Sequence, residues 1–558
     1  MSSTPQAGPT YKNDSPQQTV EAVQQVEDAA DKCFESLAIK KTLPEDSIFA
    51  LLVGGIRRVE EALPKQEQHP AQFDVLLSNL GRALSTSIKW MVQEPLGTVV
   101  VGQTWNSVLE KEVGAAIEIA NQCSNLLWAF PRWHQNYYAA ELLSGSHVRF
   151  STLVSSRQRQ VSAYQKGIRP TAGPEQAVRT APRKKAPEVA ELFASVLRGC
   201  KQSGAWGFTY DDPTELWKLL LLDYRKRVSA ITRRDPNVSL GAFTVADFSQ
   251  VYSALLSICA AHEHLCFLWQ HKSKVYPSVS CVLVRTVDEW IAVLSVLSGV
   301  SSDKCGSILG DLTFDLVRGR DLHTQPMIPL GRQAHRLAIA PPFPLHSRPD
   351  ENVLSVCSER DPKVYSIASV AKETEMLSAI VARLKHFTTR SAVKLPNGNP
   401  DIDLLVEDAD GATVIFAELK WIRKPLKAFE IAARDEDVGK GIRQLKKIRA
   451  FLQGNPGHLA KIGKMNASLN AYTNVYYLLV CRDHWTWTDP DDDIFTAEYS
   501  AFENCLRDST DLKSAVNRLL KYEWLPQEGR DFHIRFVPST LNGVVVECEL
   551  YFPGSVRL

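Results

Sequence analysis

The sequence predicts a multidomain protein whose N-terminal two-thirds are mainly α-helical and whose C-terminal third is an α/β domain with a mixed central sheet. Three observations support this prediction. The chain has 558 residues, which is more than one hydrophobic core usually accommodates. Apolar residues recur at helical spacing through most of the first 300 positions. Two short runs rich in β-branched residues, 399–406 and 414–421, lie close together in the last third and are joined by a turn.

The composition is that of an ordinary globular protein, with 44% hydrophobic and 23% charged residues. Lys and Arg number 64 against 63 for Asp and Glu, so any affinity for nucleic acid has to come from local patches. Positions 1–6 lack the basic start and apolar core of a signal peptide, and no uninterrupted apolar run reaches the roughly 20 residues that span a bilayer. The 11 cysteines form no CxxC pair, which suits a reducing compartment. We therefore expect a cytoplasmic protein with no membrane association.

Shifts in composition divide the chain into six predicted regions. In order, they are a disordered tail over 1–18, a helical domain over 19–148, a basic proline-containing linker over 149–187, a second helical domain over 188–300, an irregular connection over 301–362 and the α/β domain over 363–558. The linker has nine basic residues and a single acid. It is a candidate for contact with a phosphate backbone, and a solvated tether is the alternative.

Two groups of residues in the helical part are compatible with ligand binding, but packing explains them better. One is a set of aromatic residues that can stack on bases or pack between helices: Trp128, Trp133, Tyr137 and Tyr138. The other is Cys259, His262 and Cys266, which share one face of a predicted apolar helix. Structural zinc sites rarely draw most of their ligands from one helix. We expect both groups in the hydrophobic core.

The strongest functional signal is the hairpin predicted in the C-terminal third. Asp408–Gly411 supplies its turn, because an Asp-Gly pair favours the positive φ angles of tight turns. Side chains alternate between the two faces of a strand. Asp401 and Asp403 therefore share one face of the first strand, and Glu418 and Lys420 share one face of the second. Pairing of the strands brings these carboxylates and the amine together.

Carboxylates held close together repel one another, and a hard divalent cation removes this cost. Their oxygen ligands suit Mg²⁺ or Mn²⁺. The neighbouring Lys420 can hold a water molecule or stabilise charge that develops on a phosphate. The alternative is a solvated hairpin whose charges face water, but the apolar residues on both strands argue against it. The residues therefore predict a cation site suited to phosphodiester hydrolysis.

Pro400-Asp401, Asp403 and the Glu418–Lys420 segment together resemble the PD-(D/E)xK nuclease superfamily, the fold of many restriction endonucleases. The resemblance covers the C-terminal third and implies a restriction-endonuclease-like domain. It implies that Asp403 or Asp401 binds Mg²⁺ (or Mn²⁺) with Glu418 and a backbone carbonyl near residue 419. It also implies that Lys420 orients the attacking water or helps to deprotonate it. Asp403 is preferred because it enters a strand of Ile, Leu and Val.

The superfamily usually has a helix before the hairpin, with a glutamate that helps to bind the metal. Residues 372–386 are predicted to form such a helix with an apolar stripe, in which Glu373 falls, whereas Glu375 lies on the opposite side. A carboxylate aligned with a buried face needs a partner, and a metal ion is one. A first-turn glutamate that favours the helix dipole and reaches water is an equal alternative.

A second predicted helix, 437–452, follows the hairpin and precedes a buried strand over 474–481. Gln444 borders its apolar stripe, and the superfamily often has a supporting Gln near this place. The position four residues later is Ile448 rather than the Tyr of the best-known Gln-containing subgroup. The basic residues of this helix that are expected to bind nucleic acid are Lys440, Arg443, Lys446 and Lys447. A last hairpin, over 532–552, is expected to extend the sheet.

These features predict a metal-dependent nuclease, a phosphodiesterase of the endonuclease or exodeoxyribonuclease type that hydrolyses DNA; the residues do not separate DNA from RNA. The helical region is expected to recognise the target or a protein partner, in a defence or DNA-processing system. The alternative is a catalytically silent nuclease-fold module that binds nucleic acid or protein as a scaffold, because a fold alone does not establish an activity.

Overall fold

The structure is a computed structural model of the chain. It describes residues 10–11, 16–36, 47–66, 70–92, 107–153, 155–165, 168, 187–205, 207–232, 235–278, 280–315, 321–330, 335–347, 353, 356–357, 360–422, 425, 430–459, 468–486 and 494–554. Most of the predicted tail 1–18 and the second half of the predicted linker lie outside these residues. Within the tail, β1 (Thr10–Tyr11) is a strand and α1 begins at Pro16, so the described part of this region is ordered, contrary to the prediction.

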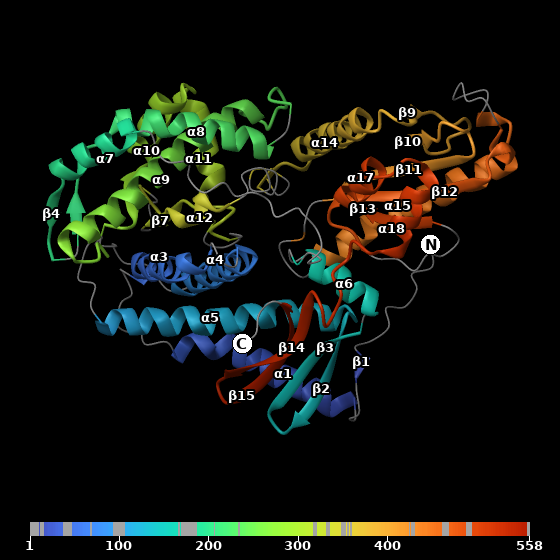
Figure 1. The fold of residues 1–558 in the computed structure, drawn as a ribbon. Helices are drawn as coiled ribbons and strands as arrows, with labels where there is room; N and C mark the ends of the chain where they lie inside the picture. Colours follow the sequence, from blue (N-terminus) through green and yellow to red (C-terminus); the bar gives the residue numbers. More distant parts are fainter. Residues whose placement is uncertain are drawn as a thin grey trace.

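Helices dominate the first 345 residues, as predicted (Figure 1). They are α1 (Pro16–Lys32), η1 (Cys33–Ser36), α3 (Ser47–Gln66), α4 (Pro70–Val92), α5 (Ser107–His134), α6 (Ser156–Gln165), α7 (Pro187–Gly199), α8 (Thr214–Thr232), α9 (Val245–Ser273), α10 (Val287–Ser298), α11 (Ser302–Leu312) and α12 (Pro342–Leu345). Buried side chains of α3–α5 and of α7–α12 belong to one hydrophobic core. Direct contacts join the two groups: His323 Nε2 lies 3.0 Å from Leu77 O, and the Arg57 guanidinium lies 5.2 Å from the centre of the Tyr276 ring. The two helical regions expected as separate domains therefore share a core.

α9 is the central helix of this core. Its N-terminus is a capping box, in which the Thr244 hydroxyl accepts the Asp247 N–H and the Asp247 carboxylate accepts the Thr244 N–H. The helix ends where Lys274 adopts a left-handed φ of 61°. α9 has the length and apolar composition of a membrane span, but 72% of its most apolar window is buried inside the protein, as in a core helix.

The cysteines and the histidine on α9 are core residues, as predicted. Cys259, His262 and Cys266 are all buried. The His262 ring lies 2.6 Å from Tyr210 Oη through Nδ1 and 2.7 Å from Ser280 O through Nε2, and burial lowers its pKa to about 4. Both ring nitrogens therefore have protein partners, and this part of the described chain has no zinc-type cluster.

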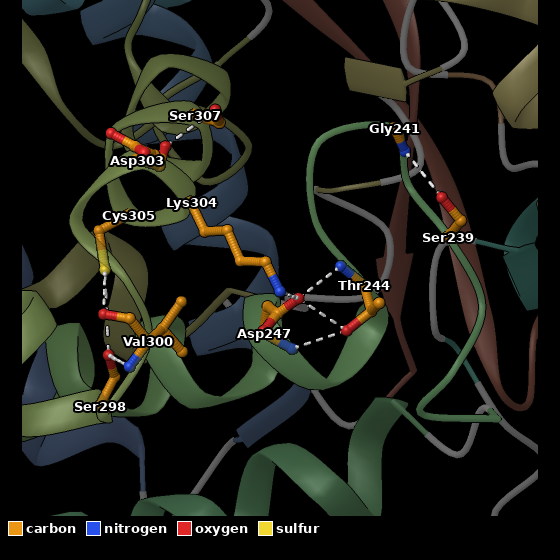
Figure 2. A network of polar contacts seen from close by, with 10 residues as sticks. All are labelled: Ser239, Gly241, Thr244, Asp247, Ser298, Val300, Asp303, Lys304, Cys305 and Ser307. Carbon is orange, nitrogen blue, oxygen red and sulfur yellow. Dashed lines mark hydrogen bonds and ion pairs between the residues drawn. The ribbon is translucent and has the colours of Figure 1, made fainter.

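Figure 2 shows how the α9 cap is tied to α11: Lys304 Nζ lies 2.8 Å from Asp247 Oδ2, the oxygen that also accepts from Thr244. We expect Asp247→Ala to lower the free energy of unfolding by about 2 kcal/mol, because the cap and this ion pair are lost together. Burial opposes ionisation of Asp247, but hydrogen bonds from Lys304 and Thr244 outweigh it and lower the pKa. The stabilisation that Asp247 provides should be complete above the ordinary carboxyl pKa. It should disappear as the pH falls through the lowered pKa of Asp247 in the folded protein.

Urea unfolding of wild type and variant, at neutral and at acidic pH, measures this difference. The matched control is Asp303→Ala, which removes an exposed carboxylate beside Lys304. It should cost clearly less. An equal loss for both variants, or a difference that does not shrink in acid, would contradict the role given to Asp247.

Short strands complete the helical part. β4 (Lys201–Ser203) and β5 (Gly207–Thr209) form a hairpin. β6 (Leu283–Thr286), β7 (Ile328–Leu330) and β8 (Arg336–Ile339) form a sheet in the order β6-β8-β7. Leu337 and Ile339 of β8 are buried in the helical core. The predicted irregular connection 301–362 thus contains α11, β7, β8 and α12, which belong to the helical part.

The hairpin predicted over 532–552 forms, but it does not extend the sheet of the C-terminal α/β domain. It joins a second sheet, built with N-terminal strands. The sheet has the order β1-β2-β3-β15-β14, with β2 (Tyr138–Ser144), β3 (His147–Thr152), β14 (Phe532–Leu541) and β15 (Val544–Pro553). β15 pairs in parallel with β3, and in Figure 1 the red C-terminal strands lie beside the cyan N-terminal ones. Leu541, Val546 and Cys548 of this hairpin pack against α1 and α5, together with Trp133 and Tyr138. The prediction that it extends the other sheet is wrong, because its apolar face completes an N-terminal core.

The described half of the predicted basic linker is also structured, as β3 and α6. Its arginines contact protein groups. Arg149 Nε lies 2.6 Å from Glu547 Oε2, Arg159 Nε donates to Thr152 Oγ1 at 3.1 Å, and the Arg157 guanidinium lies over a tyrosine ring. This half is therefore neither a tether nor a free basic surface.

The C-terminal third contains a mixed sheet, as predicted, and helices cover both of its faces. Its order is β13-β12-β11-β10-β9, with β9 (Thr388–Val393), β10 (Ile402–Glu407), β11 (Thr413–Ile422), β12 (Asn474–Asp483) and β13 (Ile494–Glu498). β9, β10 and β11 are antiparallel, whereas β11, β12 and β13 are parallel. The covering helices are α14 (Pro362–Arg383), α15 (Glu430–Gly454), α17 (Tyr499–Arg507) and α18 (Leu512–Lys521), and η2 (Leu469–Ala471) precedes β12. We call residues 360–525 the α/β unit.

One face of this sheet packs against α15, and the other packs against α14, α17 and α18. α14 and α15 begin at Pro362 and Glu430, earlier than the predicted starts at 372 and 437. The Asp361 side chain caps α14 by accepting the Lys363 N–H at 3.0 Å. The apolar stripes mark only those turns that touch the sheet, and for this reason they understate both helices.

Candidate active site

Two neighbouring strands position the predicted carboxylates. β10 pairs with β11 so that Leu404 lies opposite Ala417 and Leu405 opposite Phe416, and the next pair in this register is Asp403 with Glu418. Gly411, at φ 67°, provides the turn between the strands. Leu405 and Phe416 pack on the α15 side, and by alternation Asp403 and Glu418 face the same side. The predicted hairpin is confirmed, and it brings the two carboxylates together.

Asp403 is held in place by the backbone of the partner strand. Its Oδ2 accepts the Leu419 N–H at 2.8 Å. Burial raises the pKa of Asp403, although the Leu419 hydrogen bond, the positive charge of Lys420 and a side-chain hydrogen bond with Glu418 partly offset this effect. Asp401, just outside β10, is exposed, and its charge adds to the rise in the Asp403 pKa. Asp403 is therefore built into the site, whereas Asp401 lies at its rim.

Glu418 is the most deeply buried acid of the group, with 1% of its surface exposed. Its Oε1 lies 2.7 Å from Lys420 Nζ. Its Oε2 is buried and has no hydrogen-bond partner among the described residues. Burial and the negative charge of Asp403 raise the pKa of Glu418 to about 7, and Lys420 only partly offsets the rise. A buried carboxylate oxygen without a partner is costly, which indicates a place for a positive ligand.

Lys420 is a half-buried cation in the middle of the acidic group. Burial alone would lower its pKa, but the charges of Glu418, Glu373 and Asp403 outweigh burial and raise it. Lys420 is therefore an ammonium ion at neutral pH. In that form it can hold a water or stabilise a negative oxygen, and it is a poor proton acceptor.

Glu373 approaches the same group from α14. Its carboxylate accepts a hydrogen bond from the Trp421 N–H; burial raises its pKa, and the charge of Lys420 opposes the rise. Because α14 starts at Pro362, Glu373 lies mid-helix, so the explanation of a first-turn glutamate reaching for water is wrong. Glu373 is an α14 acid whose charge acts on Lys420.

The acids do not by themselves form a closed metal cage. No group of three or more His, Cys, Asp or Glu residues in the described part of the chain has the arrangement to hold a metal ion. Mg²⁺, however, usually keeps several waters and binds through one or two carboxylates together with substrate phosphates. The unpartnered Glu418 Oε2 beside Asp403 fits such an open site. Asp403 and Glu418 would hold the ion, and Glu373 could act through a water.

α15 places Gln444 and four predicted DNA-binding cations along the unit. Gln444 is half-buried, and no described contact joins it to the carboxylates. Lys440 pairs with Asp437 at 2.8 Å and Arg443 with Glu436 at 2.6 Å, both within the helix. Lys447 is exposed and Lys446 half-buried. The helix surface is therefore less positive than its list of basic residues suggests.

Sequence reasoning missed a polar cluster on α15 that joins distant parts of the chain. Asp435 accepts hydrogen bonds from His484 Nε2 at 3.0 Å, Thr486 Oγ1 at 2.7 Å and Tyr137 Oη at 2.7 Å. Burial opposes ionisation of Asp435, but these bonds outweigh it and lower the pKa. No local signal could identify this cluster, because Tyr137 precedes Asp435 by 298 positions.

We expect Tyr137→Phe to lower the free energy of unfolding by about 2 kcal/mol, because it removes a half-buried hydrogen bond to a charged acceptor. The matched control is Tyr472→Phe, which removes the bond from Tyr472 Oη to Glu407 Oε1 (2.7 Å) within the α/β unit. Hydrogen exchange should rise near residues 484–486 for the first variant and not for the second. Unchanged hydrogen exchange near residues 484–486 would show that Tyr137 does not hold the N-terminal helical part and the α/β unit together.

The geometry of the site is the basis for interpreting its function. Its central features are two adjoining buried carboxylates, an orphaned carboxylate oxygen and an ammonium group 2.7 Å from one of the acids. No protein-family model matches the chain, and searches of curated proteins and of solved structures found no match either.

Proposed function

We propose that this protein is a metal-dependent phosphodiesterase that cleaves DNA, with a restriction-endonuclease-like C-terminal domain of the PD-(D/E)xK type. The observation that carries the proposal is the buried Glu418 carboxylate: its Oε2 has no partner among the described residues, its Oε1 lies 2.7 Å from Lys420 Nζ, and the charge of Asp403 acts on it. A structural salt bridge would not need a second acid whose charge opposes the first. A site for a cation and a phosphate accounts for all three groups.

Each residue has a distinct role in this proposal. Asp403 and Glu418 hold a Mg²⁺ or Mn²⁺ ion, which when bound neutralises phosphate charge and acidifies a water. Lys420, as an ammonium ion, orients the attacking water and stabilises the negative charge that develops on the phosphate. Glu373 helps to keep Lys420 charged, because its carboxylate, bound to the Trp421 N–H, attracts the ammonium. Asp401 lies at the rim and contributes to substrate position, and Gln444 would contribute from the surface of α15.

The test is direct. The purified full-length chain is incubated with linear, nicked and single-stranded DNA, and with RNA, in the presence of Mg²⁺, Mn²⁺ or EDTA. Cleavage that needs the cation and is lost in EDTA supports the proposal. Binding of nucleic acid without cleavage under any cation would instead establish the silent scaffold module.

A further inference from the structure

Arg482 is a cation at the edge of the candidate site. It lies on β12 opposite Trp421 of β11, and the preceding pair in this parallel register is Cys481 with Lys420. Arg482 is thus one position beyond Lys420 at the carboxyl ends of two parallel strands. Open α/β sheets bind ligands outside the carboxyl ends of their strands.

An aromatic platform holds the Arg482 guanidinium. Its central carbon lies 4.0 Å from the centre of the Trp421 ring and 5.1 Å from that of the Tyr499 ring. The indole is itself fixed, since Trp421 Nε1 donates to Asp483 Oδ2 at 2.5 Å. Stacking orients a guanidinium without using its N–H groups. The donors of Arg482 therefore remain available for a ligand.

The Trp421 indole is flanked by a second cation, Lys372, as well as by the Asp483 carboxylate. Lys372 Nζ lies 4.6 Å from the centre of the same Trp421 ring, so two cations share one indole. For Arg482, the described part of the chain shows no ion pair or hydrogen bond to a carboxylate. A guanidinium whose N–H groups are not paired with a carboxylate can bind two phosphate oxygens at once.

We propose that Arg482 binds the phosphate that neighbours the scissile one in the nucleic-acid strand. The inference rests on the proposed function and assigns it a substrate-positioning residue. Side chains alternate along a strand, so Arg482 projects from the face opposite to Lys420 and reaches a different phosphate. A contact to the backbone carries no base information, so its effect is the same for every sequence.

The test measures binding of fluorescently labelled DNA to the full-length chain by anisotropy, in calcium to slow turnover, over a range of salt concentrations. Arg482→Ala should raise the Kd by about 5–10-fold at moderate salt and reduce the slope of log K against log salt by about 0.9, as for one lost phosphate contact. Arg482→Lys keeps the charge and should preserve the slope while weakening binding by about 2–3-fold. Both effects should be equal for unrelated sequences.

The matched control is Arg535→Ala. Arg535 is an exposed arginine whose guanidinium lies 5.8 Å from the Phe552 ring, on the other sheet, so its loss also removes one charge and one aromatic contact. It should leave the Kd and the slope unchanged. Arg482→Gln is a second neutral variant, and melting curves confirm that each variant is folded. A Kd and slope equal to those of wild type for Arg482→Ala and Arg482→Gln would overturn the inference.

The outcomes separate the two proposals. DNA binding that depends on Arg482 in a protein that cleaves nothing with Mg²⁺ or Mn²⁺ retains the phosphate site and removes the phosphodiesterase. Cleavage by wild type, with Arg482 variants that bind and cleave normally, removes the Arg482 site alone. A chain that binds no nucleic acid removes both.

Discussion

Lys420→Ala is expected to lower the rate of cation-dependent DNA cleavage by about 10³-fold, because a preorganised charge that stabilises a developing negative oxygen contributes about 3–4 kcal/mol. The Lys420 ammonium lies 2.7 Å from Glu418 Oε1, and the surrounding acids raise its pKa, so it carries its charge in the working pH range. It is half-buried at the end of a strand, so truncation removes charge with little loss of packing. The fold should remain intact.

Single-turnover cleavage of labelled DNA, with circular dichroism of each variant, measures this effect. Glu418→Gln should show a loss of similar size, because it removes a carboxylate proposed to hold the cation while keeping the shape of the side chain. Lys521→Ala, which removes an exposed lysine at the end of α18, is the control and should cleave at the wild-type rate. Full Mg²⁺-dependent cleavage by a Lys420→Ala, Glu418→Gln double variant would remove the assignment.

Mg²⁺ is expected to stabilise the wild-type protein at about pH 8 and much less at about pH 5.5. Because the folded-state pKa of Glu418 rises from 4.5 to about 7, the folded state holds a proton that the unfolded chain releases. The free energy of unfolding therefore falls by up to about 3 kcal/mol as the pH rises from the Glu418 pKa of the unfolded chain to that of the folded protein. Above the folded-state pKa the loss is complete. A cation replaces the proton, so its affinity should be about 30-fold weaker at the lower pH.

Thermal melting tests this linkage without reference to activity. Mg²⁺ at about ten times its Kd adds about 1.4 kcal/mol, or roughly 3–6 °C, at the higher pH. At the higher pH, Glu418→Gln should melt at a higher temperature than the cation-free wild type, and Mg²⁺ should change its melting temperature little. Glu523→Gln, which alters an exposed acid of the same unit, should behave as wild type. An equal Mg²⁺ response in the Glu418→Gln variant would contradict the proposed site.

Local patterns predicted the part of the site that lies on one hairpin. Asp403, Glu418 and Lys420 are close in the chain, their strands are joined by an Asp-Gly turn, and alternation determines which side chains share a face. Periodicity places Glu373 on the correct helix but leaves two explanations for its carboxylate. Only the early start of α14 at Pro362 decides between them, because it moves Glu373 from a helix end to its middle.

The pairing of strands that are distant in the chain could not be predicted from the sequence, for a different reason. The 532–552 hairpin has the correct turn at Asn542-Gly543, yet its partner strand β3 lies about 400 positions away in the chain. Nothing in either strand specifies the other, since parallel pairing uses backbone groups that every residue carries. The same holds for Tyr137 and Asp435, and for the helices before and after the predicted linker that share one core.

The sequence by itself determined the central hairpin of the α/β unit with its chemical character, and the parts of α14, α15 and β12 that pack on the sheet, because these depend on side-chain periodicity over a few residues; β9, β13 and α17 were not predicted. The tertiary structure decided how deeply Glu418 is buried, that its Oε2 lacks a partner, and that Arg482 stacks on Trp421 beside the site. These properties depend on desolvation and on charges brought together by packing, and the free energy of such effects depends on distance in space rather than on separation along the chain.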